Sequence, residues 1–436
     1  MTVSDTGKDP SAAAAGALVA MLSAAHLATA DDIPAIAREY VGSFGGSDAV
    51  CFLADLQQTV LVPFFGPEGP PPDVQAEPLA IESTIAGRAF QHVQSLVQHT
   101  DAGTTVWLPL LDGTERLGVL AVSVDGGETY VTDGPAATGL GAFASLLGEL
   151  IMTKTVYGDT IVRLRRLSSM GLAAEMQWSL LPPLTFACEK VTVAAALEPA
   201  YEVAGDTIDY AVDPGWARVA VFDGMGHGLE SARLAAMSVA AYRHARRAGR
   251  SLLETCTEID DTLLASFGGT TFTTAVLAEL DTELGVLSWV NAGHPEPLLL
   301  RRGRLVKSLH SAPRPPLGLG LAGADGAAPA TVATEQLEPG DCVLFYTDGV
   351  TDARSPTGEF FGDQRLVDLV VRNLASGLPA PETMRRVVRA LLEHQEGHLE
   401  DDASMAFVQW RSDTEALLPQ PPPPVSEPDR GLPRPS

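Results

Sequence analysis

Basic residues are scarce in this chain of 436 residues. Lysine and arginine together number 29, against 55 aspartates and glutamates, so the formal net charge is -26 at pH 7. A surface with this excess of negative charge repels the phosphate groups of nucleic acids and of anionic membranes. We therefore expect neither nucleic acid nor a membrane as a partner. An acidic chain can hold divalent cations where several carboxylates gather at one place.

Cysteine is also rare, and its four positions show no CxxC or CxxxC spacing. The sequence therefore predicts neither a zinc site nor a disulfide framework, and we expect a reduced, cytoplasmic protein. The stretch 12–30 has no Asp, Glu, Lys or Arg, but it consists mostly of Ala, Gly, Ser and Thr. This composition favours a packed helix over a signal peptide or a membrane span.

Changes in amino-acid composition and hydrophobic pattern divide the chain into five segments. Hydrophobic residues make up 45% and charged residues 19%, which is typical of globular proteins. The two ends differ, because the C-terminal end is rich in proline and poor in apolar residues. The predicted segments are a disordered N-terminus (1–11), a first α/β domain (12–135), a helical linker (136–183), a second, strand-rich domain (184–412) and a Pro-rich disordered tail (413–436).

The first domain begins with a helix and continues with short apolar strands and a second helix. A β-hairpin is predicted where Asp112-Gly113 separates the strands Thr105 to Leu111 and Gly118 to Val124. The stretches AIESTIAGRAF and VWLPLLDGTERLGVLAVSV resemble a GAF domain, a small sensory module. The resemblance implies either a pocket for an unknown small ligand or a purely structural dimerisation module.

The linker has apolar residues at spacings of three and four over residues 136–181, which indicates helix, with a break at Tyr157-Gly158. A long helix between two domains buries its apolar stripe either on its own domain or on a partner chain. We expect a homodimer through this helix, and we expect the helix to connect sensor and effector.

The second domain alternates groups of strands with pairs of helices. This order favours an antiparallel α+β layered sandwich over a parallel doubly wound sheet. Four acidic positions stand at strand ends beside a glycine or a second acid: Gly205-Asp206, Asp223-Gly224, Asp348-Gly349 and Asp401-Asp402. One Asp-Gly pair usually marks a turn, but four such positions together indicate a Mg²⁺ or Mn²⁺ site built from oxygen ligands.

These positions fall within motifs that resemble the PPM-type, metal-dependent serine/threonine phosphatases, in the branch of the bacterial sporulation stage II phosphatase E. The resemblance implies an α-β-β-α sandwich and two ions of Mn²⁺ or Mg²⁺. It covers about 220 residues, in the order AEMQWSLLPP, EVAGDTIDYAV, VFDGMGHGLESARLA, FTTAVLAELD, VNAGHPEPLLL, LFYTDGVTDAR and EDDASMAF.

The resemblance also implies roles for individual residues. Asp223 matches the acid that bridges the two metals, Gly224 offers its carbonyl to the second metal, and Asp206 serves that second metal. The acids that match the remaining ligands of the first metal are Asp348 and Asp401, with Asp402 as the alternative to Asp401.

The implied reaction is attack of a water, shared between the metals, on the phosphorus of the substrate. The leaving oxygen needs a proton, which some family members take from a histidine directly after the Asp-Gly pair. Met225 occupies that position here, and His227 follows two residues later. His227 is either this acid or a loop histidine that contacts phosphate or solvent. Asn291 and His294 are interpreted as turn residues.

The function predicted from these motifs is a protein serine/threonine phosphatase. The resemblance implies that its substrate is a phosphorylated anti-sigma-factor antagonist or a similar small regulator, and that the sensor domain controls it. One alternative is a catalytically silent regulator that kept the fold. Another is a phosphohydrolase for a small phosphoester. Such an enzyme is expected to contain a phosphate-binding Gly-x-x-x-x-Gly-Lys loop, which the sequence lacks.

Overall fold

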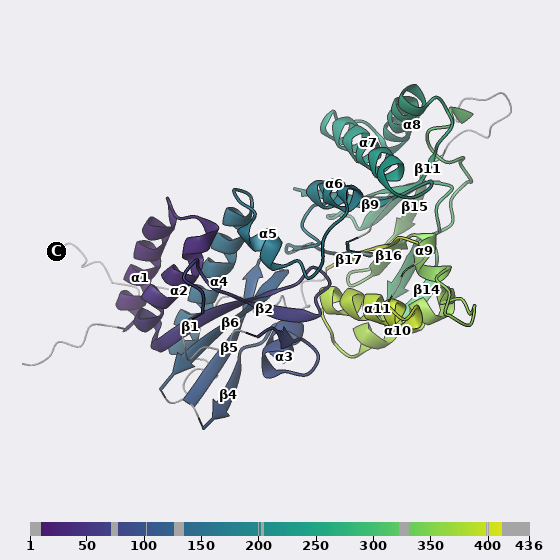
Figure 1. Ribbon diagram of the computed structural model, residues 1–436. Helices are drawn as coiled ribbons and strands as arrows, with labels where there is room; N and C mark the ends of the chain where they lie inside the picture. Colours follow the sequence, from purple (N-terminus) through teal and green to yellow (C-terminus); the bar gives the residue numbers. More distant parts are fainter. Residues whose placement is uncertain are drawn as a thin grey trace, which may run out of the picture.

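The structure is a computed structural model that describes most of the chain. The described chain forms two bodies with separate cores, which we call the N-terminal domain (10–155) and the C-terminal domain (185–411) (Figure 1). The Pro-rich tail and most of the expected disordered N-terminus lie outside the described residues, and the first helix begins at Pro10. The described ranges are 10–70, 77–101, 103–125, 135–198, 200–201, 205–321, 331–397, 399 and 401–411.

The N-terminal domain is built on one antiparallel sheet of six strands, in the order β3-β2-β1-β6-β5-β4. Helices α1, α2 and α4 bury their apolar side chains on one face of this sheet, and α3 packs on the other face. The predicted hairpin is confirmed as β5 and β6. The elements are α1 (Pro10–Ala25), α2 (Ile33–Tyr40), β1 (Gly46–Ala54), β2 (Val60–Phe64), β3 (Leu79–Ala80), α3 (Ile85–His92), β4 (Leu96–Thr100), β5 (Gly103–Asp112), β6 (Glu115–Val124) and α4 (Pro135–Thr155).

Helix α4 contains the first part of the predicted linker, and its apolar stripe is buried on its own domain. Phe143 stacks on Phe44 with ring centroids 4.7 Å apart, and Leu147 is fully buried in the same core. The helix ends at Thr155 and α5 (Thr160–Leu164) follows, so the predicted break at Tyr157-Gly158 is confirmed. Helix α6 (Leu172–Leu180) then leads into the C-terminal domain. A homodimer through this segment stays a prediction.

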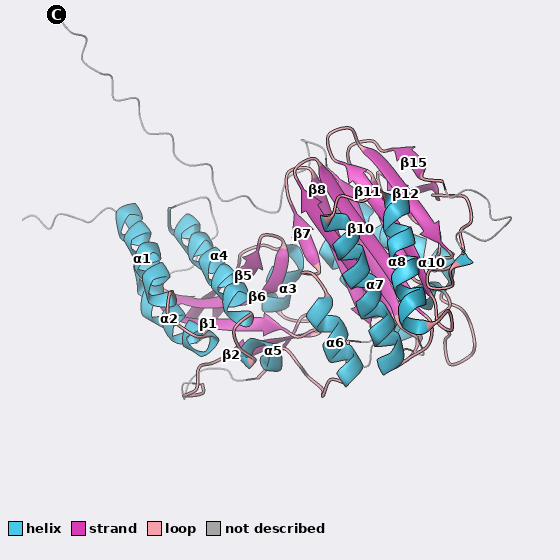
Figure 2. Cartoon of the chain, turned by 90° about the horizontal axis from the view of Figure 1, so that it is seen from above, coloured by secondary structure: helices cyan, strands magenta, loops and turns pink. Residues whose placement is uncertain are grey.

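The C-terminal domain is a sandwich of two antiparallel sheets, as predicted. The sheet orders are β15-β12-β11-β10-β9 and β14-β13-β16-β17-β8-β7, and an apolar core fills the space between them. Helices α7 and α8 cover the outer face of the first sheet (Figure 2), and α10 and α11 cover the second (Figure 1). These four layers confirm the α-β-β-α class. The strands are β7 (Thr185–Ala187), β8 (Val191–Glu198), β9 (Asp206–Asp213), β10 (Trp216–Gly224), β11 (Thr273–Asp281), β12 (Val286–Ala292), β13 (Leu298–Arg301), β14 (Arg304–Ser308), β15 (Ala333–Gln336), β16 (Cys342–Tyr346) and β17 (Ala403–Trp410). The helices are α7 (Leu229–Arg247), α8 (Leu252–Phe267), α9 (Asp348–Thr351), α10 (Gly362–Ala375) and α11 (Ala380–His394).

Polar side chains join the two domains. Arg116 of β6 forms an ion pair of 2.8 Å with Glu382 of α11. Gln57, in the loop after β1, donates to Glu198 at the end of β8 over 3.0 Å. Arg385 of α11 returns toward the N-terminal domain and donates to the carbonyl of Gln58. Interfaces of this polar kind are typical of domains that can move relative to one another.

Within the described ranges, no helix is long and apolar enough to cross a membrane. Within the described residues, none of the four cysteines forms a disulfide bond.

Candidate metal centre

Two predicted ligands lie side by side on neighbouring strands. Asp206 begins β9 and Asp223 stands near the end of β10, and the antiparallel register pairs them directly. The strand ends come close because Gly224 donates its N–H to the carbonyl of Gly205 over 3.1 Å. A Cβ on Gly205 would lie 2.2 Å from the Gly224 carbonyl oxygen, so this approach requires glycine.

The second sheet contributes the other two predicted ligands at the ends of adjacent strands. Asp348 follows β16 and begins the short helix α9, whereas Asp401 stands two residues before β17. Again a glycine permits the approach, because a Cβ on Gly349 would lie 1.9 Å from the carbonyl oxygen of Asp402. Both acid-bearing segments therefore turn at the same end of their sheet.

Hydrogen bonds tie the two sheets together at this end. The hydroxyl of Thr347 donates to Oδ2 of Asp206 over 2.6 Å, and the N–H of Gly205 donates to Oδ2 of Asp402 over 2.5 Å. One bond runs from the second sheet to the first, and the other runs in the opposite direction. The structure thus brings the four acidic positions found in the sequence to one end of the sandwich.

The neighbouring acids Asp401 and Asp402 have different surroundings. Asp402 is buried, and its Oδ2 accepts hydrogen bonds from the N–H groups of Gly205 and Asp206. Asp401 is exposed, and its Oδ1 accepts the N–H of Asp402 over 2.9 Å. The carboxylate of Asp402 therefore orders the backbone, which supports the choice of Asp401 as the ligand.

The acids raise one another's pKa values. Burial and the nearby carboxylates of Asp348, Asp401 and Asp402 raise the pKa of Asp223 to about 7. Burial, followed by Asp223 and Asp402, raises the pKa of Asp206 well above its usual range. In both cases hydroxyl groups oppose this rise, and no lysine or arginine is among the main causes of the shift. Such crowding of negative charge without a neighbouring basic side chain fits a site for divalent cations.

The donor set also fits such cations, because carboxylate and carbonyl oxygens are the ligands that Mg²⁺ and Mn²⁺ prefer. However, among the described residues no three Asp, Glu, His or Cys side chains have the geometry of a complete metal site. The acids are neighbours rather than a closed ligand shell. The assignment of Asp206, Asp223, Gly224, Asp348 and Asp401 as ligands is therefore a proposal, which we take up below.

The structure also shows residues around the acids that sequence reasoning missed. Thr347 directly precedes Asp348, and Gln177 of α6 donates to the carbonyl of Asp206 over 2.6 Å. Thr274 lies 3.5 Å from Oδ2 of Asp223 and 2.8 Å from Nδ1 of His294. These residues lie in the motifs AEMQWSLLPP, LFYTDGVTDAR and FTTAVLAELD, but a hydroxyl or amide gives no sign in sequence of what it will contact.

Asn291 and His294 form the turn that the sequence predicts. The N–H of His294 donates to Oδ1 of Asn291, and Nδ2 of Asn291 donates back to the carbonyl of His294, both over 2.8 Å. Burial lowers the pKa of His294 to about 3, so its ring is neutral at pH 7. A neutral ring fits its contact with the hydroxyl of Thr274.

His227 lies in an exposed turn between the end of β10 and the start of α7. No hydrogen bond or ion pair of its side chain is found within the described part of the chain. His227 is therefore close to Asp223 in the sequence, but no hydrogen bond or ion pair of the described residues links its side chain to the acids.

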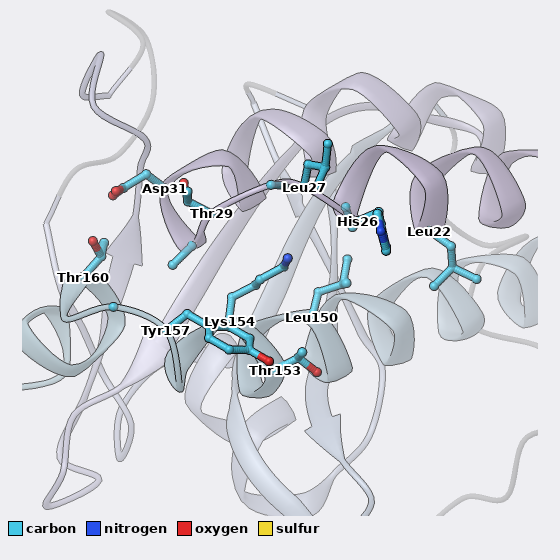
Figure 3. Close-up of a pocket in the computed structure, with 14 residues that line it drawn as sticks. Leu22, His26, Leu27, Thr29, Asp31, Leu150, Thr153, Lys154, Tyr157 and Thr160 are labelled. Carbon is cyan, nitrogen blue, oxygen red and sulfur yellow. The ribbon is translucent and has the colours of Figure 1, made fainter.

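A hollow of about 720 Å³ lies elsewhere, in the N-terminal domain between the ends of α1 and α4 (Figure 3). Leu22, His26 and Leu27 line one side, and Lys154 and Tyr157 line the other. None of the predicted metal ligands borders this hollow. A small ligand for the N-terminal domain stays a prediction.

Comparison with known proteins finds a family match over most of the C-terminal domain. Residues 213–411 match the family described as Stage II sporulation protein E (SpoIIE). Protein IcfG of Synechocystis sp. is 33% identical over 138 residues, which are 31% of this chain and 20% of IcfG. Phosphoserine phosphatase RsbP of Bacillus subtilis is 26% identical over 219 residues, which are 49% of this chain and 51% of RsbP.

The chain thus spans about half the length of RsbP and a fifth of IcfG. Among solved structures, the RsbU and RsbW domains of Rv1364c from Mycobacterium tuberculosis are 26% identical, with a TM-score of 0.44. That match covers 52% of this chain and 61% of the other. The matched family segment contains Asp223, Asp348 and Asp401, and Asp206 stands seven residues before it. Most of the C-terminal domain of this chain is therefore similar to the SpoIIE family.

Proposed function

We propose that the C-terminal domain is a metal-dependent phosphatase that removes phosphate from phosphoserine or phosphothreonine in a regulatory protein. The observation that carries the proposal is the meeting of four acid-bearing strand ends at one end of the sandwich, joined by bonds from Thr347 and Gly205. Three of these acids lie in the segment that matches the phosphatase family.

The residues that would hold two Mn²⁺ or Mg²⁺ ions are assigned from their places on the strands. Asp223 would contribute to both cations, Asp206 and the carbonyl of Gly224 to one, and Asp348 and Asp401 to the other. Bound cations of this kind supply a water nucleophile at neutral pH and positive charge for the phosphoryl oxygens.

Two further residues of the chain would support the reaction, Asp402 by holding the backbone and His227 by donating a proton. The bonds of Asp402 to Gly205 and Asp206 hold the backbone of the first sheet in place. His227 is the candidate that protonates the leaving seryl or threonyl oxygen, because its exposed turn follows Asp223 directly and is open to a protein substrate. The proton on its ring would pass to that oxygen as the bond to phosphorus breaks.

The proposed substrate is a phosphorylated anti-sigma-factor antagonist or a similar small regulator. The motif resemblance of the C-terminal domain supports this choice, and so does the similarity to RsbP, which is a phosphoserine phosphatase.

Control by the N-terminal domain is also part of the proposal. Helix α6 is bonded to the backbone beside the acids, because Gln177 donates to the carbonyl of Asp206 and Trp178 donates to that of Ala200. Arg243 of α7 holds the end of the same helix through the carbonyl of Leu180. A shift of α6 would therefore move the backbone of a proposed ligand, which makes the helix a means of switching activity.

A phosphatase assay of the full chain with Mn²⁺ tests the function. The substrates are a phosphoserine protein and a nucleotide, and the variants are Asp223→Ala and Asp213→Ala. Asp213 is an exposed acid at the far end of β9, so its loss controls for the removal of one negative charge.

We expect Asp223→Ala to lower the rate of phosphate release by at least about 1000-fold, because a cation's contribution to the transition state is several kcal/mol. Asp213→Ala should behave as the wild type. Full activity in Asp223→Ala would refute the site, and faster release from the nucleotide would refute a protein substrate. Protein binding without any phosphate release would favour the silent regulator.

A further inference from the structure

Thr347 links the two sheets at the acidic site through its hydroxyl. It is the residue between β16 and Asp348, and its side chain is fully buried. Its Oγ1 accepts the N–H of Ser404 over 2.9 Å and donates to Oδ2 of Asp206 over 2.6 Å. Because an amide N–H can only donate, the hydroxyl proton stays available for the carboxylate. A contact of 3.5 Å with the Ser404 carbonyl is too long to compete well.

This hydroxyl is the principal hydrogen-bond donor to the carboxylate of Asp206. Its carboxylate is 2% exposed and lies near the negative charges of Asp223 and Asp402, which repel it. Its backbone is held separately, by Gln177 at the carbonyl and by Asp402 at the N–H. The bond from Thr347 therefore acts on the one part of Asp206 that would face a cation.

The next residue in β9 provides a contrast. Thr207 is also buried, at 1% exposed, but its hydroxyl has no hydrogen-bond partner in the described structure. Two buried threonines thus differ in their hydroxyl groups, because that of Thr347 bonds to Asp206 and to the N–H of Ser404, whereas that of Thr207 bonds to neither.

We propose that Thr347 is a positioning residue for the metal centre, which fixes the carboxylate of Asp206 in the orientation it needs to share a cation with Asp223. The inference rests on the proposed function. Since Thr347 and Asp348 are adjacent in the chain, a single backbone segment then sets the positions of acids from both sheets. Residues that orient metal ligands in this way typically change metal affinity by about 10- to 100-fold when they are removed.

Binding of Mn²⁺ alone to the full chain tests this role, with free Mn²⁺ measured by electron paramagnetic resonance. Thr347→Val keeps the shape of the side chain and removes the hydroxyl, whereas Thr347→Ser keeps the hydroxyl. Thr207→Val is the matched control, because it makes the same change at a buried position without a bond to lose. If Thr347→Val does not fold, as judged by circular dichroism, the smaller Thr347→Ala replaces it.

We expect Thr347→Val to weaken Mn²⁺ binding about 10- to 100-fold. Thr347→Ser should recover most of the affinity, and Thr207→Val should bind like the wild type. In the phosphatase assay, the loss in Thr347→Val should shrink as Mn²⁺ is raised, while KM for the phosphoprotein stays unchanged.

Three results would overturn the inference while the proposed function stands: wild-type affinity in Thr347→Val, no recovery in Thr347→Ser, or an equal loss in Thr207→Val. A wild-type protein that binds no Mn²⁺ would instead overturn the proposed function, and the role of Thr347 with it.

Discussion

Arg116 and Glu382 lie 266 residues apart in the chain, yet their side chains form an ion pair of 2.8 Å that is buried on both sides. The guanidinium of Arg116 also lies over the ring of Phe90, and its Nη2 donates a hydrogen bond to Oε1 of Gln58. This pair joins β6 of the N-terminal domain to α11 of the C-terminal domain. Loss of one partner from a buried pair is costly, because the other charge remains in a poorly solvated place.

The first prediction concerns this contact between the domains. Arg116→Met should lower the free energy of unfolding by about 1 to 3 kcal/mol, because Glu382 keeps its bonds to Arg385 and Arg386 but loses one cation. In calorimetry, the docked domains of the wild type should unfold together in one transition, whereas Arg116→Met should show two transitions. Arg218→Met, which removes two partly exposed ion pairs within the C-terminal domain, with Asp213 and Glu279, is the control. A single, unshifted transition in Arg116→Met would contradict the prediction.

The second prediction concerns Glu198. Burial raises the pKa of its carboxyl group to about 7, although the hydrogen bonds from Gln57 and Ala200 act to lower it. The unfolded chain has the ordinary value near 4.5, so the folded state holds a proton that the unfolded state loses first. Stability should therefore fall as pH rises from about 4.5 to 7, and stay low above 7. Glu198→Gln removes this penalty and should stabilise the protein by about 1 to 3 kcal/mol at pH 8, with almost no effect at pH 4.5.

Both bonds to Glu198 go to the same oxygen, Oε2, so the amide of Glu198→Gln can accept both. Urea unfolding at the two pH values measures the effect. Glu393→Gln, at an exposed position of α11, should show no difference between them. An equal gain at both pH values in Glu198→Gln would indicate a cause other than ionisation.

The third prediction concerns helix α6. Gln177→Met removes the bond to the carbonyl of Asp206 but keeps the length of the side chain. We expect phosphatase activity to fall about 10-fold, because a support of a proposed ligand is lost. Ser179→Ala, at an exposed position of the same helix, should leave activity unchanged. Activity within twofold of wild type in Gln177→Met would argue against control through this helix.

The fourth prediction concerns His227 as the proton donor. His227→Gln should slow release of phosphate from phosphoserine on the order of 100-fold, since a seryl oxygen leaves poorly without a proton. The aryl substrate p-nitrophenyl phosphate, whose leaving group needs no proton, should be hydrolysed at nearly the wild-type rate. His244→Gln, at an exposed position of α7, is the control. Equal losses on both substrates would assign His227 a role other than acid catalysis.

The sequence by itself determined the elements of the C-terminal domain and the four acidic positions. The strand from Ala217 to Phe222 and the helix from Glu230 to Ala245 were predictable because hydrophobic periodicity is a local property. The acids Asp206 and Asp223 were visible because four acidic positions at strand ends, each beside a glycine or a second acid, are more than turns alone explain.

Only the tertiary structure decided which groups surround those acids. The bond from Thr347 to Asp206 spans 141 residues, and the bond from the Gly205 N–H to Asp402 spans 197, so no local pattern marks either pair. The same holds for the contact of Arg116 with Glu382 and for the apolar stripe of α4, which the periodicity left free to pack on its own domain or on a second chain. The local sequence determines the hydrophobic period of each helix or strand. The packing of distant elements determines which residues it contacts, because burial of apolar surface is favourable regardless of separation along the chain.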